Sequence, residues 1–218
     1  IIPCFNEKNT IEEIIDKINK SDTLNCDKEI IVVDDSSTDG STKLLEEILE
    51  NKKISKLIKN HKNYGKGFSI RKGIEDSNGD IVIIQDADLE YDPNDYKKLL
   101  EPIVNGYADV VYGSRFLGSS KVRVLYYWHS VGNYFLTLFS NMLTNLNLTD
   151  MEVCYKAFKS DIIRSIKLKE ERFGFEPEIT AKISKIKNLR LYEVSVNYYG
   201  RKYSEGKKIT WRDGLSAL

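Results

Sequence analysis

The stretch Gly79-Asp-Ile-Val-Ile-Ile-Gln-Asp-Ala-Asp-Leu-Glu-Tyr-Asp-Pro93 decides how the chain folds. Its apolar run at 81–84 has no polar alternation, which is typical of a strand buried on both faces of a parallel sheet. Asp86, Asp88 and Glu90 follow directly. Open α/β sheets bind ligands beyond the carboxyl ends of their strands. The sequence therefore predicts a binding site at this acidic segment.

Asp86 and Asp88 are candidate ligands of a divalent cation. Side chains two residues apart in an extended chain point the same way, and two carboxylates so placed repel each other unless a cation lies between them. Oxygen ligands favour Mg²⁺ or Mn²⁺, held by one or two carboxylates and by substrate phosphates. A solvated acidic turn closed by Asp92-Pro93 explains the same residues, and the motif alone does not decide between the two.

The composition fits one globular domain. The chain has 218 residues, of which 41% are hydrophobic, enough for a sizeable core over residues 1–218. It opens at Ile1-Ile2-Pro3, which reads as the end of a first strand whose front edge is trimmed. Three widely spaced cysteines form no metal-binding pattern and indicate a reducing compartment. No signal peptide precedes them, so we expect a cytoplasmic protein.

Charge is unevenly distributed although the net charge is zero. Residues 1–155 contain 18 basic and 25 acidic side chains, whereas 156–213 contain 15 basic and 8 acidic ones. The acidic part suits a cation, and the basic part suits phosphates or an anionic membrane surface. A chance distribution is the alternative.

Apolar runs that read as strands alternate with amphipathic segments that read as helices. The first helix shows the pattern clearly, with isoleucines at positions 11, 14, 15 and 18. The expected strands lie at 1–2, 29–33, 54–59, 81–84, 109–113, 152–158 and 189–199. This alternation predicts βαβ units and an α/β fold with a mainly parallel central sheet flanked by helices.

Polar loops follow two more of these strands. Asp34-Asp35 opens a hydroxyl-rich loop that suits a ribose and a base. Helix capping within 37–39 is the alternative, and it leaves the aspartate pair unexplained. Asn63-Tyr64-Gly65-Lys66-Gly67 fits a phosphate site at a helix start and fits a plain turn equally well. It is neither a Walker A loop nor a dinucleotide-binding fingerprint.

Two later segments are unusual. Residues 124–149 carry no charged side chain, yet they are too polar and too interrupted to span a bilayer. They form a helix that either packs on the sheet or lies in a membrane or dimer interface. Residues 200–208 carry four cations, Arg201, Lys202, Lys207 and Lys208. They read as a mobile basic loop that closes over a diphosphate, with a solvated tail as the alternative.

The ordered set of motifs resembles the family 2 glycosyltransferases, which have the GT-A fold. The resemblance covers nearly the whole chain through the segments 2–7, 34–41, 63–67, 86–88 and 113–116. Asp-Met-Glu-Val-Cys-Tyr-Lys at 150–156 and the basic segment from 200 resemble the polyprenyl-phosphate branch of that family. This branch includes dolichyl-phosphate mannose synthases and bacterial polyprenyl-phosphate glucosyltransferases.

The resemblance implies a donor site. Asp35 would contact the base, and the same nucleotide pocket would include Pro3, Asn6, Glu7 and Lys66. Asp86 and Asp88 would hold the metal on the donor diphosphate, with Asp88 as the more direct ligand. Glu90 is a further candidate ligand, at a place where dolichyl-phosphate mannose synthases often carry glutamine.

The resemblance also implies an acceptor site. Arg115 would bind the acceptor phosphate, and either Arg123 or His129 would complete that site. Arg201, Lys207 and Lys208 would close over the diphosphate.

The implied activity is inverting transfer of a hexose from GDP-mannose or UDP-glucose to a polyprenyl or dolichyl phosphate at a membrane surface. A phosphate is already anionic, so no protein base is needed. A soluble enzyme acting on a glycan hydroxyl is the first alternative, and Glu176 or Glu178 would then be its base. A non-catalytic nucleotide-sugar binding module is the second. We expect no nucleic-acid partner, and the oligomeric state stays open.

Overall fold

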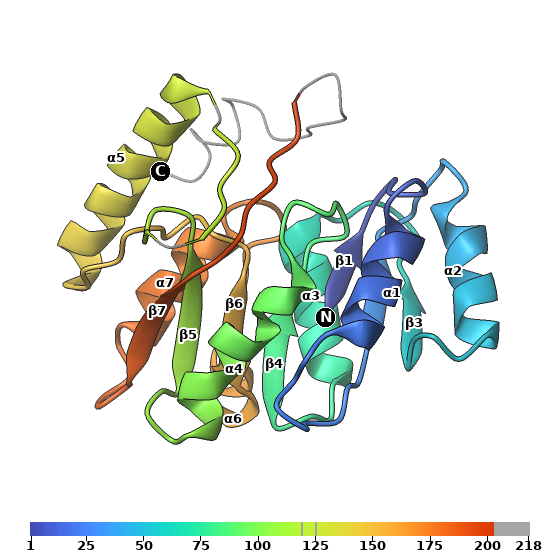
Figure 1. Ribbon diagram of the computed structural model, residues 1–218, viewed down its shortest axis with the longest axis horizontal. Helices are drawn as coiled ribbons and strands as arrows, with labels where there is room; N and C mark the ends of the chain where they lie inside the picture. The colour runs from blue at the N-terminus through green and yellow to red at the C-terminus, as the bar shows by residue number, and fades with distance from the viewer. Residues whose placement is uncertain (119, 125, 203–218) are drawn as a thin grey trace.

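The computed structural model describes residues 1–118, 120–124 and 126–202 (Figure 1). The strands of this part are β1 (Ile2–Cys4), β2 (Ile31–Asp34), β3 (Lys56–Lys59), β4 (Ile81–Ile84), β5 (Val110–Ser114), β6 (Lys156–Lys159) and β7 (Leu191–Ser195). The α-helices are α1 (Ile11–Lys20), α2 (Ser41–Glu50), α3 (Lys66–Asp76), α4 (Tyr96–Val104), α5 (Tyr127–Thr144), α6 (Ser160–Ser165) and α7 (Phe175–Ile183). A short 3-10 helix, η1, spans Pro93–Asp95.

The strands form a mixed central sheet that is mostly parallel. β1, β2 and β3 pair in parallel, and the order β4-β6-β5-β7 forms the other part. Ile1 connects the two parts, because its amino group donates to the Ile83 carbonyl at 2.8 Å and its carbonyl accepts from the Gln85 N–H at 3.0 Å. Only β6, among the described strands, runs antiparallel to its neighbours. The predicted fold class is therefore confirmed, with one reversed strand.

Helices cover both faces of this sheet (Figure 1). The isoleucines of α1 at positions 11, 14, 15 and 18 are all buried, as their periodicity predicts. All four residues of β2 are buried as well. This packing fixes the carboxyl ends of β1, β2 and β4 beside one another, which is what the site requires.

Two predicted strands have different bounds in the structure. The strand expected at 152–158 is β6 at Lys156–Lys159, and the one expected at 189–199 is β7 at Leu191–Ser195. Residues 150–155 precede β6 as a largely buried turn. These residues are apolar because the irregular segment is buried. The pattern of apolar residues in a sequence does not distinguish a buried irregular segment from a short buried strand.

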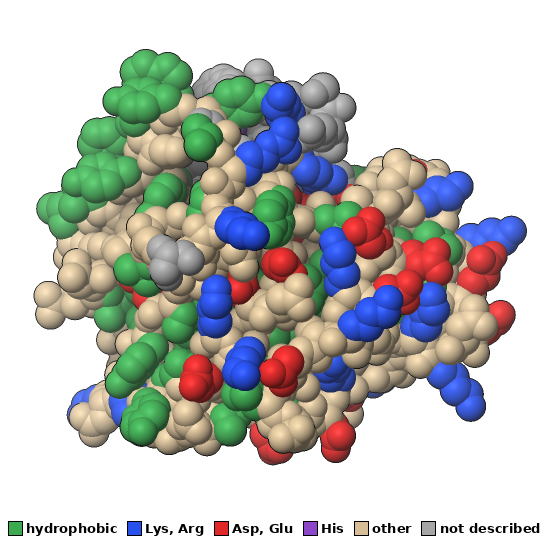
Figure 2. Space-filling model, in the orientation of Figure 1, with side chains coloured by type: hydrophobic (Ala, Val, Ile, Leu, Met, Phe, Trp, Pro, Cys, Tyr) green, Lys and Arg blue, Asp and Glu red, His purple; other side chains and the backbone are tan. Residues whose placement is uncertain are grey.

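Helix α5 exposes its apolar face to the surroundings, so of the two alternatives left open for 124–149 the packing of its aromatic side chains on the sheet is not what the structure shows. Trp128 is 77% exposed and Met142 74%, whereas Thr137 and Ser140 are buried. The polar side faces the protein because it makes specific hydrogen bonds there: Thr137 Oγ1 accepts from the Met151 N–H at 3.2 Å. Figure 2 shows the resulting group of hydrophobic side chains over α5. No helix of the described residues is long and apolar enough to cross a membrane.

Candidate active site

The acidic segment after β4 forms a tight turn at the carboxyl edge of the sheet. Leu89 adopts a left-handed conformation with φ of 64°, which is unfavourable for a non-glycine side chain. The turn lets the Glu90 N–H donate to Asp88 Oδ1 at 3.1 Å. Backbone strain of this kind persists where surrounding contacts enforce it, and it is frequent at functional sites.

Arg201 contacts three carboxylates, two from the acidic segment after β4 and one, Glu7, that is far from them in the sequence. Its guanidinium lies 3.0 Å from Glu7 Oε1 and 3.2 Å from Asp88 Oδ2, both through Nη2. Its backbone N–H donates to Glu90 Oε1 at 2.7 Å. A cation thus occupies the centre of the acidic cluster, and it comes from the segment that was predicted to close over the diphosphate.

The electrostatics of this cluster suit a divalent cation. Burial, followed by the charges of Asp86 and Glu90, raises the pKa of Asp88 to about 7, although Arg201 acts in the opposite direction. A carboxylate under such repulsion gains from added positive charge. No group of three or more His, Cys, Asp or Glu side chains converges as a metal cluster within residues 1–118, 120–124 and 126–202. Asp86 and Asp88 fit a cation held by one or two carboxylates and completed by a diphosphate, because carboxylate oxygens are the ligands that Mg²⁺ and Mn²⁺ prefer.

Glu90 is poorly placed as a third ligand of such a cation. Its Oε2 accepts from the Tyr198 hydroxyl at 2.8 Å, while its Oε1 accepts from the Arg201 backbone. Both oxygens thus fasten the segment after β7 to the turn after β4, and the prediction of Glu90 as a metal ligand gains no support here.

Lys66 links the acidic segment to helix α7. Its Nζ lies 3.0 Å from Asp86 Oδ1 and 3.1 Å from Glu176 Oε1, and its side chain is 15% exposed. A lysine between two carboxylates beside Asp88 is well placed to meet the phosphates of a donor.

The loop around Lys66 is a packed turn. Asp35 accepts from the backbone N–H groups of Tyr64 at 3.0 Å and Gly65 at 2.7 Å, and the Phe68 N–H donates to the Glu171 carbonyl. Gly65 has φ of 112°, and a Cβ there would lie 2.4 Å from that same carbonyl oxygen. This close approach requires a glycine at position 65. The Asp35 carboxylate holds the loop in place through its two hydrogen bonds, so a base bound to Asp35, as predicted, would have to share the same carboxylate.

Pro3, Asn6 and Glu7, which were predicted to line a nucleotide pocket, lie at the adjoining edge of the sheet. Pro3 lies within β1. Asn6 Oδ1 accepts from the Thr38 N–H at 2.8 Å, and the Glu7 N–H donates to Ser41 Oγ at 3.0 Å. The two loops after β1 and β2 are thereby fastened together, because parallel neighbours end at the same edge of the sheet.

Arg115, the predicted acceptor residue, follows β5 and lies on the other side of the acidic turn. Its Nε and Nη2 donate to the two oxygens of Asp150, each at 2.7 Å, and Nη2 also donates to Asn133 of α5 at 3.1 Å. Its guanidinium carbon lies 5.1 Å from the centre of the Tyr198 ring. These bonds to Asp150 and Asn133 hold the planar guanidinium in one orientation.

The structure places the two candidates for a second acceptor residue differently. Arg123 donates through Nη1 to the Gly200 carbonyl at 3.0 Å, so it lies beside the segment that carries Arg201. His129 is in the first turn of α5, with its ring 5.5 Å from that of Tyr126. Lys207 and Lys208 lie outside the described residues.

Three acids near the site have no role in the predicted reaction. Glu152 was not predicted as a site residue, and Glu176 and Glu178 were predicted only as bases for the alternative glycan acceptor. Glu152 Oε1 and Glu176 Oε2 are buried without a hydrogen-bond partner among the described residues. Burial, followed by the charge of Glu176, raises the pKa of Glu152 to about 7. Glu178 is different, since it accepts from the backbone N–H groups of Lys169 and Glu170. Glu152 belongs to the motif at 150–156, and that motif was the feature of the sequence from which its place near the site could have been predicted.

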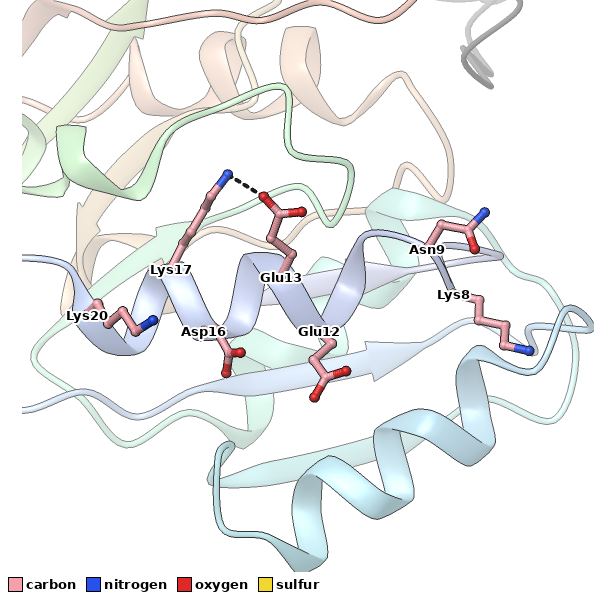
Figure 3. Close-up of a pocket in the computed structure, with 7 residues that line it drawn as sticks. All are labelled: Lys8, Asn9, Glu12, Glu13, Asp16, Lys17 and Lys20. Carbon is pink, nitrogen blue, oxygen red and sulfur yellow. Dashed lines mark ion pairs between the residues drawn. The ribbon is translucent and has the colours of Figure 1, made fainter.

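A separate hollow runs along the outer side of α1 and gathers none of the predicted site residues. Figure 3 shows its charged side chains, among which Lys17 Nζ lies 2.8 Å from Glu13 Oε1. Its lining residues are Lys8, Asn9, Glu12, Glu13, Asp16, Lys17 and Lys20. Solvated pairs of this kind are common on helices and indicate no ligand.

The fold is of the GT-A type, and the sequence comparison identifies the family. Residues 1–167 match the model of glycosyl transferase family 2, so the chain belongs to that family. The fold is shared with glucosyl-3-phosphoglycerate synthase from Mycobacterium tuberculosis, solved with Mn²⁺, UDP and glucosyl-3-phosphoglycerate. That match has a TM-score of 0.71 and 20% identity over 99% of this chain and 75% of the other.

Curated relatives with sequence similarity include lipid-phosphate sugar transferases. The undecaprenyl-phosphate 4-deoxy-4-formamido-L-arabinose transferase of Aeromonas hydrophila is 28% identical over 95% of this chain. The dolichol-phosphate mannosyltransferase of Pyrococcus furiosus is 35% identical over 56% of it. The chain spans 61% and 34% of the lengths of these two proteins. The UDP-N-acetylglucosamine–dolichyl-phosphate N-acetylglucosaminyltransferase of Methanococcus voltae is 27% identical over 94% of this chain and 86% of its own length.

Proposed function

We propose that this chain transfers a hexose from a nucleotide-diphosphate sugar to a polyprenyl or dolichyl phosphate, with inversion at the anomeric carbon. The observation that carries the proposal is the position of Tyr198 between two charged groups. Its hydroxyl donates to Glu90 in the acidic cluster, and its ring lies against the Arg115 guanidinium. A site for a cation and diphosphate thus adjoins a site for an anion, as transfer between two phosphorylated substrates requires.

The donor side supports a metal-dependent reaction. Asp88 and Asp86 would hold Mg²⁺ or Mn²⁺, which would supply charge stabilisation for the departing diphosphate. Lys66, bonded to Asp86 at 3.2 Å, adds a second positive charge beside it. GDP-mannose and UDP-glucose are the donors that we would test first, with Asp35, Asn6 and Glu7 at the nucleotide.

The acceptor side supports a phosphate nucleophile. An acceptor phosphate oxygen attacks the anomeric carbon, the bond to the diphosphate breaks, and the nucleoside diphosphate leaves. The acceptor is already anionic at neutral pH, so no proton has to be removed. Arg115 would orient it, and Asp150 holds Arg115 in place through two hydrogen bonds. The names of the relatives in Aeromonas, Pyrococcus and Methanococcus support an acceptor of this class.

Helix α5 supports a membrane surface as the place of reaction. Asn133 of α5 bonds to Arg115, so an acceptor phosphate at Arg115 would lie at the foot of the exposed apolar face. That face consists of Tyr127, Trp128, Tyr134, Phe135, Leu138, Phe139, Met142 and Leu143. A lipid chain leaving the phosphate would meet it directly, which supports peripheral attachment to a membrane, and we propose the cytoplasmic side as its place.

The test is release of nucleoside diphosphate from UDP-glucose, GDP-mannose and UDP-N-acetylglucosamine, with Mn²⁺ or Mg²⁺, in the presence and absence of a short polyprenyl phosphate. We expect release that requires the lipid phosphate and that is lost with EDTA and in Asp88→Ala. Asp80→Ala is the matched control, because Asp80 is exposed at the other end of β4.

Transfer to a glycan hydroxyl is the second candidate function. The observation that favours it is Glu176, a buried carboxylate with an unpartnered oxygen that would serve as the base. Turnover with a glycan acceptor, and none with the lipid phosphate, would establish this alternative and leave the donor site unchanged.

A further inference from the structure

Two acids, Glu176 and Glu152, lie near the residues proposed for the donor and the acceptor, and neither has a role in the transfer to a lipid phosphate described above. Glu176 is 4% exposed and reaches the donor side through Lys66, which also contacts Asp86. Glu152 lies on the acceptor side, since Arg115 and Asp150 both influence its charge. The charge of Glu176 also acts on Glu152, so the two acids connect the residues proposed for the donor with those proposed for the acceptor.

Each acid has an oxygen without a partner among the described residues, Glu152 Oε1 and Glu176 Oε2. An unsatisfied buried carboxylate oxygen is costly, and native proteins keep such a group mainly where a ligand or water completes it. Sugar hydroxyls are donors that match these acceptors, and their directions differ between epimers. The nearby Glu178 differs, because its carboxylate accepts hydrogen bonds from the backbone N–H groups of residues 169 and 170. Among these three acids, only Glu152 and Glu176 have an oxygen without a hydrogen-bond partner among the described residues.

We propose that Glu152 and Glu176 bind hydroxyl groups of the transferred hexose and so determine which sugar the enzyme accepts. The inference rests on the proposed function, because it assigns the sugar subsite of that reaction. The lysine bridge couples this subsite to the diphosphate: Lys66 holds Glu176 Oε1, which leaves Oε2 for the sugar.

The test compares binding of a nucleoside diphosphate with binding of its sugar conjugate, by calorimetry with Mn²⁺. The pairs are UDP with UDP-glucose and GDP with GDP-mannose. In Glu176→Gln, Lys66 selects the amide oxygen, and the NH₂ group then faces the sugar where an acceptor is needed. We expect affinity for the conjugate to fall about tenfold while affinity for the free diphosphate changes less than about twofold. Glu152→Met, which removes the polar atoms at similar length, should behave alike.

Glu178→Gln is the matched control, since this acid is two residues from Glu176 but bonds to the backbone. We expect it to lower the melting temperature and to leave the ratio of the two affinities unchanged. The rate of transfer from different donors gives a second readout. In Glu176→Gln and Glu152→Met, the rates with two epimeric donors, UDP-glucose and UDP-galactose or GDP-mannose and GDP-glucose, should differ less than in the unaltered protein.

Two outcomes would overturn the sugar subsite. Equal loss of affinity for the diphosphate and the conjugate would show that Glu176 acts only through Lys66. No change in either affinity would show that the two oxygens are merely hydrated. Absence of any nucleotide binding by the unaltered protein would instead contradict the proposed function itself.

Discussion

Arg201 Nη2 lies 3.2 Å from Asp88 Oδ2, so a cation from the segment after β7 neutralises the carboxylate that follows β4. The same nitrogen lies 3.0 Å from Glu7 Oε1. Arg201 thus supplies positive charge to the acidic cluster from within the protein. Binding of a metal–diphosphate complex would have to share these carboxylates with Arg201 or displace it.

Replacing Arg201 with glutamine should make stability depend on a divalent cation. The variant leaves Glu7, Asp88 and Glu90 without their shared countercharge, so its melting temperature in EDTA should fall by about 2–4 °C for each kcal/mol lost. Mn²⁺ should restore more stability to the variant than to the unaltered protein. Thermal unfolding with and without Mn²⁺ measures both effects.

Arg190→Gln is the control for that experiment. Arg190 forms a comparable ion pair, with Nη2 2.7 Å from Asp109 Oδ1, at the opposite end of the sheet. Its loss should lower stability without changing the response to Mn²⁺. An equal Mn²⁺ response in both variants would contradict the role given to Arg201.

Asp88→Asn should weaken metal-dependent nucleotide binding while leaving the fold intact. The change relieves the repulsion that raises the pKa of Asp88, so the melting temperature in EDTA should stay the same or rise. Binding of UDP or GDP in the presence of Mn²⁺ should fall at least about tenfold, as expected from losing a charged ligand. Calorimetry measures the affinity, and Asp80→Asn should bind like the unaltered protein.

Arg115→Lys should damage use of the acceptor and spare the donor. Lysine keeps the charge but cannot form the two parallel bonds to Asp150 that orient the guanidinium. The KM for a polyprenyl phosphate should rise at least about tenfold. The affinity for nucleoside diphosphate should remain near normal, and its loss in Arg115→Lys or Arg115→Ala would refute the assignment.

Polar substitutions on the exposed face of α5 should weaken membrane binding. Phe135→Ser combined with Met142→Ser removes two large side chains that are 62% and 74% exposed, so stability should change little. Flotation with anionic vesicles should show less bound protein. Tyr107→Ser is the control, since this residue is 62% exposed between α4 and β5. Failure of the unaltered protein to bind vesicles would contradict the membrane proposal.

Glu152 should make the protein less stable as the pH rises. Its pKa in the folded state, about 7, exceeds the ordinary value of 4.5. The folded state therefore holds this proton more tightly, and the stabilisation that is present below 4.5 is lost as the pH rises through 7. Glu152→Gln removes the ionisation, so it should raise the melting temperature at about pH 8.5 and have little effect at about pH 5. A pH-independent effect in thermal unfolding would contradict this account.

Much of the fold could be predicted because its signals are local. The apolar run at 81–84 and the isoleucine period from Ile11 to Ile18 identify a buried strand and an amphipathic helix without any tertiary information. The reversed direction of β6 could not be read this way, since a strand has the same side-chain pattern in either direction. The orientation of α5 was also undetermined, because its polar face carries no charged residue that would mark it as the solvent side.

Part of the candidate site could likewise be predicted from local motifs, and part could not. Asp86, Asp88 and Lys66 were predicted from short motifs beside a strand end or a helix start, and the structure brings them together. The pairing of Arg201 with Glu7 across 194 positions, and the buried oxygens of Glu152 and Glu176, could not be predicted. Side-chain partners so far apart are set by the path of the backbone, which no local pattern encodes.

The sequence by itself determined the α/β class, the acidic edge and the membership of a transferase family, because periodicity and motif order are properties of neighbouring residues. Only the tertiary structure decided which charges meet. It placed Arg201 on Asp88, and it fastened Arg115 to Asp150 and left Glu176 with an unpartnered oxygen. The physical reason is that electrostatic and hydrogen-bond energies depend on distance in space, and chain separation does not fix that distance.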